Sequence, residues 1–147
     1  MQWLLLVFAV LAGVMLPIQA GLNAWLGRGL GHPVVATFAS FLIGSVALAF
    51  FCVAIRVPWP TLTVAGELPW WTWTGGLLGA CYLVLSIILV PKLGATTLFA
   101  AVIAGQLAAS LLLDHFGLVG FAVHPLNFWR IAGVALIAAG VALVRTH

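Results

Sequence analysis

Five polar side chains lie inside long apolar stretches of this sequence: Gln19, Asn23, Tyr82, Gln106 and Ser110. An amide, hydroxyl or phenol buried in lipid is costly, because lipid offers it no hydrogen-bond partner. These groups must therefore face protein or a water-filled cavity. Uncharged donors and acceptors of this kind can hold a polar solute without reacting with it. We predict that the five side chains line one central cavity and bind substrate there.

A structural interpretation of some of these residues remains open. Gln19 and Asn23 are one helical step of four residues apart, and both could simply bond to neighbouring helices, as polar residues often do in membranes. Tyr82 could likewise bond to a neighbouring backbone instead of facing a cavity. Only the overlap of polar positions on several segments favours a path for a solute.

One acid, Asp114, lies at the edge of an apolar stretch. Membrane carboxylates often carry protons in transporters, so Asp114 could couple transport to protons. It lies about 30 Å along a helix from Lys92, however, which places it near the opposite membrane surface. This position favours a structural role, either as a helix cap or as a partner of Arg130.

Motifs for catalysis or metal binding are not found in the sequence. It has no GxSxG, no HExxH, no phosphate-binding glycine loop and no paired carboxylates. The four histidines lie in loops or at the terminus without ligand spacing, and the two cysteines are isolated. We therefore expect no enzyme activity, no metal and no cofactor.

Composition places the chain in the membrane. It is 65% hydrophobic and 5% charged, whereas soluble domains carry about 25% charged residues. The five cations are scattered singly, which suits anchoring at lipid headgroups and not a nucleic-acid surface. The first segment lacks the cationic start of a signal peptide and stays apolar through Leu26, so we expect it to remain as a span. The prediction is a multi-pass membrane protein.

Five segments can cross the roughly 30 Å apolar core as helices, at about 3–26, 34–55, 70–90, 95–113 and 125–145. The predicted fold is an all-α membrane protein with one transmembrane domain over 1–147. Only 14 uncharged residues separate Arg130 from Arg145, so the last span is expected to begin at Pro125, with Arg130 reaching outward from its first turns. Pro33 suits the first turn of the second span.

Small residues indicate where helices pack. In the first span, Gln19 and Asn23 are expected to share a polar face, opposite a face of small residues and proline made of Gly13, Pro17, Gly21 and Ala24. In the second span, a small and mildly polar face is expected to serve packing; it consists of Ala36, Thr37, Ser40, Gly44 and Ala47. The Gly75-xxx-Gly79 spacing permits a close helix crossing.

Three segments carry a resemblance to a known family: PIQAGLNAWLG at 17–27, HPVVATFASFLIG at 32–44 and PKLGATTLFAAVIAGQLAASLLLDHFGLVG at 91–120. They resemble the YdcZ family of the drug/metabolite transporter superfamily. The resemblance implies a location in the inner (plasma) membrane, five transmembrane helices per chain, a half-transporter bundle and assembly from two oppositely oriented halves. The chain also looks related to the small multidrug exporters, whose first helix carries a glutamate. Here that span offers only Gln19 and Asn23, which argues against proton-coupled export of organic cations.

The favoured function is transport or export of a small polar metabolite by alternating access in an antiparallel dimer. The alternatives are a non-transporting membrane subunit that supports another protein, and a small-solute channel. Alternation of five spans puts Arg28, Lys92 and Arg145 on one side and Arg56 and Arg130 on the other. Three cations against two give almost no orientation bias. We therefore expect dual topology and an antiparallel homodimer, with an oppositely oriented homologous subunit as the rival partner.

Overall fold

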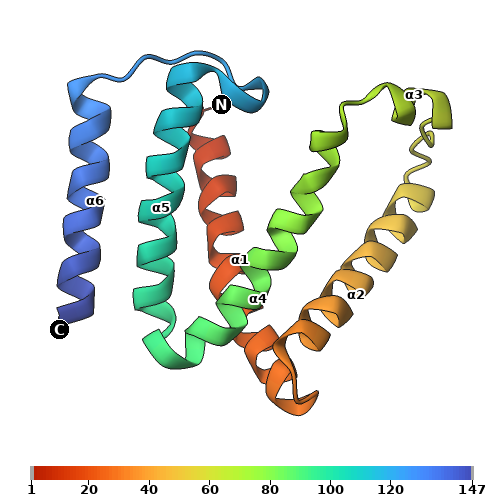
Figure 1. Cartoon of the computed structure of the whole chain (residues 1–147), viewed down its shortest axis with the longest axis horizontal. Helices are drawn as coiled ribbons and strands as arrows, with labels where there is room; N and C mark the ends of the chain where they lie inside the picture. The colour runs from red at the N-terminus through yellow and green to blue at the C-terminus, as the bar shows by residue number, and fades with distance from the viewer. Residues whose placement is uncertain (1, 147) are drawn as a thin grey trace. The chain divides into compact units, whose positions relative to one another are not determined.

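The structure of the chain is a computed structural model that describes residues 2–146, except for the side chains at 2 and 62 (Figure 1). Every regular element in this range is helical. The elements are α1 (Gln2–Gly29), α2 (Pro33–Ala54), α3 (Leu62–Glu67), η1 (Trp70–Thr74), α4 (Gly75–Leu93), α5 (Ala95–Phe116), η2 (Leu118–Gly120) and α6 (Phe128–Thr146). The predicted all-α class is confirmed.

Five helical stretches of the described chain are long and apolar enough to cross a membrane: Trp3–Gly29, Pro33–Ala54, Trp70–Leu93, Ala95–Phe116 and Phe128–Thr146. Each matches one predicted segment, although several ends differ by a few residues. The shortest has 19 residues, which at 1.5 Å per residue gives about 28 Å, enough for the apolar core of a bilayer.

Helix ends follow local capping more closely than they follow the apolar pattern. Pro33 is the first residue of α2, as predicted, and the His32 ring accepts the Val34 backbone N–H at 3.2 Å. α6 begins at Phe128, three residues later than we expected from the sequence. The reason is Asn127, whose side-chain oxygen accepts the backbone N–H of Arg130 at 2.9 Å and caps the helix.

The chain forms two compact units, Met1–Pro91 and Lys92–His147. The boundary falls within the last turn of α4, which continues past Pro91 to Leu93. Each unit has its own helix packing. A single transmembrane domain over the whole chain stays a prediction.

In the first unit, α1 and α2 meet near the turn that joins them. The buried residues at this meeting are small or polar: Ala20, Asn23, Ala24, Ala36 and Thr37. α4 joins them through a small core of Ala36, Leu83 and Ile87. A side chain at Gly27 would place its Cβ 3.1 Å from Ile87 Cγ2, so glycine allows α4 to approach here.

The buried face of α1 includes Ala24, as predicted, but differs from the predicted small face at Gly13 and Gly21. Asn23 lies on the same buried stripe as Ala20, Ala24 and Gly27. Gly13 and Gly21, expected to be the packing glycines, have open space where a Cβ would be. The packing stripe is thus displaced by about one residue from the predicted small face. The physical reason is that Asn23 finds a hydrogen-bond partner on α2, which removes the cost of burying it.

In the second unit, α5 and α6 run side by side in opposite directions, joined by a connection that crosses one end of the pair (Figure 1). α5 ends at Gly117, which adopts the left-handed conformation with φ 60° and donates its N–H to the Leu113 carbonyl. A Cβ at Gly117 would lie 2.7 Å from Val123 Cγ2, so the chain folds back tightly at this point.

Candidate functional site

A groove of about 300 Å³ runs between α1 and α2. Its walls are apolar except at three positions; the lining residues are Met15, Ile18, Gln19, Leu22, Asn23, Ser40 and Ile43. Gln19 is exposed, whereas Asn23 is only 5% exposed. The structure therefore brings two of the five predicted site residues together in one groove.

The polar base of the groove is a hydrogen bond between the two helices. The Ser40 hydroxyl donates to Asn23 Oδ1. Among the described residues, no side-chain nitrogen or oxygen is both enclosed and without a partner. Since the bond from Ser40 occupies the oxygen of Asn23, the amide nitrogen keeps its N–H groups free to donate. Asn23 lines both this groove and a neighbouring hollow of about 530 Å³ formed with Leu22, Trp25, Leu26 and Gly29.

The depth of these groups follows from helix geometry. Arg28 lies in the last turn of α1 and suits the headgroup level. With 1.5 Å per residue, Asn23 lies about 7 Å and Gln19 about 13 Å further along the helix. Gln19 is thus near the middle of an apolar core about 30 Å thick. The groove extends from close to the membrane surface towards the membrane centre.

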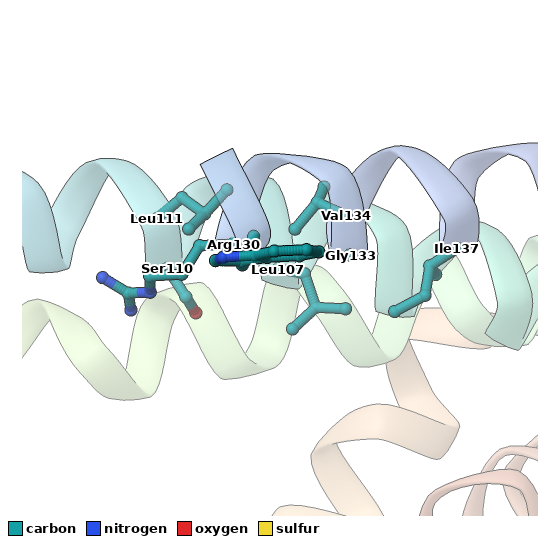
Figure 2. A pocket seen from close by; sticks show the side chains of 8 residues that line it. Leu107, Ser110, Leu111, Arg130, Gly133, Val134 and Ile137 are labelled. Carbon is teal, nitrogen blue, oxygen red and sulfur yellow. The ribbon is translucent and has the colours of Figure 1, made fainter. Parts of the chain in front are cut away.

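A second groove, of about 260 Å³, lies between α5 and α6 (Figure 2). It is lined by Leu107, Ser110, Leu111, Trp129, Arg130, Gly133, Val134 and Ile137. Ser110 is exposed, and it shares this groove with Arg130. Apart from these two side chains the lining is apolar or aromatic, which suits a lipid chain or another helix better than a polar solute.

An ion pair closes one end of the α5–α6 pair. Arg130 donates from Nη2 to the Asp114 carboxylate and from Nη1 to the His124 carbonyl, the second at 2.8 Å. The His124 backbone N–H in turn donates to the Asp114 carbonyl at 2.8 Å. The Leu126 N–H donates to His115 Nδ1 at 3.3 Å. These bonds tie the connection to both helix ends.

The positions of the two charges explain why they pair. Asp114 lies in the last turn of α5 and Arg130 in the first turn of α6. Each charge therefore faces the helix-dipole end of its own sign, which is unfavourable for both. Pairing the two offsets this repulsion. The ion pair expected as one alternative is present, whereas its role in structure or in coupling stays a prediction.

Tyr82 and Gln106 line neither groove. Tyr82 is half-buried on α4 in the first unit, where its carbonyl accepts the Ser86 hydroxyl at 2.8 Å. Gln106 is exposed on α5 in the second unit. Gln19, Asn23 and Tyr82 thus belong to one unit and Gln106 and Ser110 to the other, and the single cavity lined by all five stays a prediction.

Two contributors were not identified from the sequence. Ser40 was assigned to a packing face of the second span, although it is the partner that orients Asn23. His124 was dismissed for lack of metal-ligand spacing, whereas its backbone holds both members of the ion pair. Ser40 could have been found as a hydroxyl among small residues on one face of an apolar span. The histidine acts through its backbone, which leaves no signal in the sequence.

Within residues 2–146, no three or more His, Cys, Asp or Glu side chains gather in a way that could hold a metal ion. The chemistry available in the α1–α2 groove is therefore hydrogen bonding and apolar contact. These interactions can bind and orient a solute.

Comparison with known proteins gives two matches. The model of the family described as "Putative inner membrane exporter, YdcZ" matches residues 4–143. The "Inner membrane protein YdcZ" of Escherichia coli (strain K12) is 30% identical over 149 residues, covering 97% of this chain and 95% of that protein. No solved structure matches the chain.

The family description indicates membrane transport in general and suggests a protein that is not an enzyme. It agrees with the five apolar helices and with the predicted location. On this evidence, the chain belongs to the YdcZ family of multi-pass inner membrane proteins.

Proposed function

We propose that this chain is half of a transporter that moves a small polar solute across the inner membrane by alternating access. The observation that carries the proposal is the buried Asn23–Ser40 pair at the base of the α1–α2 groove. A polar residue that only held two helices together would have no need of a groove beside it. Here both side chains line about 300 Å³ of space between membrane-spanning helices.

Solute movement needs a second copy in this proposal. Larger transporters build their sites from two inverted repeats, and opening alternates as one repeat rocks against the other. One chain of 147 residues supplies a single set of five spans. Two copies inserted in opposite directions would supply the inverted pair. Support comes from the near balance of cations, three on one side and two on the other by alternation of the spans.

We expect the solute to move outward. The family is described as an exporter, which supports outward movement of the solute. The ion pair of Asp114 with Arg130 supports a structural role for this carboxylate, since it joins the end of α5 to the start of α6. Coupling would then arise from the gradient of the solute or from another ion.

Flux measurements test the proposal. A thermal-shift screen against polar metabolites selects a ligand, because binding to the folded form raises its apparent stability. Uptake of that ligand, radiolabelled, is then measured in proteoliposomes that hold the purified chain. A transporter shows saturable uptake that unlabelled ligand on the opposite side accelerates. A channel shows flux without this acceleration, and a supporting subunit shows no flux.

A pair of hydroxyl variants links the flux to the groove. Ser40→Ala removes the donor that orients Asn23, whereas Ser45→Ala removes an exposed hydroxyl from the same helix outside the groove. We expect Ser40→Ala to lower the initial rate of uptake by about tenfold, which corresponds to the free energy of one lost hydrogen bond. Ser45→Ala should leave uptake unchanged. Equal effects of the two variants would contradict the assignment of the site.

A further inference from the structure

The groove between α1 and α2 contains polar groups but no charge. Over its 22 residues α2 carries no charged side chain, and α1 carries only Arg28 in its last turn. Arg28 follows Asn23 by five residues, which places it about 140° around the helix and therefore on a different side. The remaining charges of the first unit, Arg56 and Glu67, lie outside both helices. The first unit therefore offers a solute in this groove no countercharge.

The lack of a countercharge selects against ions. Moving an ion from water into a low-dielectric site is very unfavourable unless an opposite charge accompanies it there. One amide nitrogen and one exposed glutamine cannot replace the water around a full charge. A solute that carries a net charge should therefore bind much more weakly than an uncharged solute of the same shape.

The orientation of Asn23 selects a functional group. Its oxygen accepts the Ser40 hydroxyl, so the amide has only N–H donors to offer a solute bound beside it. Its best complement is a strong acceptor such as a carbonyl oxygen. The other walls, formed by Met15, Ile18, Leu22 and Ile43, suit an apolar body.

We propose that the α1–α2 groove binds an uncharged solute that brings a carbonyl oxygen to the amide nitrogen of Asn23 and an apolar body to the surrounding wall. The groove volume of about 300 Å³ lies at the small end of known ligand pockets. The inference deepens the proposed function by naming the class of solute. It depends on that function for movement of the solute but not for binding.

Five compounds of nearly the same shape separate charge from hydrogen bonding. Benzamide and acetophenone are uncharged and carry a carbonyl, and α-methylstyrene is uncharged and carries none. Benzoate is an anion and benzamidinium a cation. Binding of each is measured by ligand-observed NMR with the purified full chain in nanodiscs, and empty nanodiscs report partitioning into lipid.

The expected result is a preference for the two uncharged carbonyl compounds. They should bind about tenfold more tightly than α-methylstyrene, which lacks the acceptor, and about 100-fold more tightly than either ion. Asn23→Leu should abolish the difference between acetophenone and α-methylstyrene. The proposal would be overturned if either ion bound more tightly than the uncharged carbonyl compounds. It would also be overturned if Asn23→Leu left the binding of every compound unchanged.

A second variant keeps the test valid if Asn23→Leu does not fold. Asn23→Asp has nearly the same shape and adds one negative charge. At alkaline pH it should reverse the preference, so that benzamidinium binds at least tenfold more tightly than benzamide. An unchanged preference would show that Asn23 does not face the bound solute. If the binding pattern holds but proteoliposomes show no flux, the proposed function fails while this inference stands.

Discussion

Reversing the ion pair at the end of α5 and α6 should stabilise the protein or leave its stability unchanged, although it changes two charges. Asp114 and Arg130 each lie near the helix-dipole end of their own sign. In the exchanged variant, Asp114→Arg with Arg130→Asp, the cation lies at the carboxyl end of α5 and the anion at the amino end of α6. Both dipole interactions then become favourable while an opposite pair is kept.

The magnitude follows from exposure and geometry. The side chains of Arg130 and Asp114 are 31% and 23% exposed, so the pair lies between a surface and a buried ion pair. A coupling energy of about 1–2 kcal/mol is expected for such a charged hydrogen bond. Each dipole interaction is worth about 0.3–1 kcal/mol. The exchange also loses the bond from Arg130 to the His124 carbonyl, about 1 kcal/mol.

The variants then follow a definite order. Asp114→Asn or Arg130→Gln alone should lower the free energy of unfolding by about 1–2 kcal/mol, because the remaining charge is left unpaired. The double neutral variant should be about 1 kcal/mol less stable than the parent, since the loss of the pair and of both unfavourable dipole interactions nearly cancel while the bond from Arg130 to the His124 carbonyl is lost. The exchanged variant should equal the parent or exceed it by up to about 3 kcal/mol, because each reversed dipole interaction changes by twice its value and the lost bond takes back about 1 kcal/mol.

Thermal unfolding in detergent, followed by fluorescence of the seven tryptophans, measures this order. The double-mutant cycle isolates the interaction energy of the pair. Additive effects of the two neutral substitutions would show that the side chains do not interact. An exchanged variant as unstable as the single variants would show that the helix dipoles do not govern this site.

Three further predictions concern the turn, the topology and the role of the acid. Gly117→Ala should destabilise the chain clearly more than Gly120→Ala by thermal unfolding, because both glycines have positive φ but only Gly117 has a neighbour in the way, at 2.7 Å. Cysteines placed singly at Gly29 and Leu93, in a chain without its native cysteines, should each be about half accessible to a membrane-impermeant label in intact cells, as dual insertion requires; uniform accessibility or protection would favour an unlike partner. Asp114→Asn should lower stability without changing the pH dependence of solute flux in proteoliposomes, and a lost pH dependence in a folded variant would assign Asp114 to proton coupling.

The number and approximate position of the spans could be predicted because burial in lipid demands long apolar runs. The ends could not be predicted as closely. The apolar pattern does not reveal that Asn127 caps α6 or that α4 continues through Pro91. These details depend on single hydrogen bonds and on where a neighbouring segment approaches.

The packing face of α1 shows a second limit. Periodicity gives the angle between residues on one helix but not the direction from which the next helix comes. Gly13 and Gly21 looked suited to close approach, yet α1 buries Ala20, Ala24 and Gly27. The choice is made by Ser40 on α2, which supplies the partner that Asn23 needs. The packing face of α1 can therefore be predicted only when the facing residues of α1 and α2 are considered together.

Asn23 also shows that the two interpretations of a membrane-buried amide are compatible. A side chain that holds helices together and one that binds a solute were treated as alternatives. An amide has an acceptor and two donors, however, and here the bond from Ser40 uses only the acceptor. The same bond that joins α1 to α2 fixes the direction of the N–H groups in the groove. Helix packing thus sets the orientation of the site, so a change in the angle between α1 and α2 would alter both the groove and the donors within it.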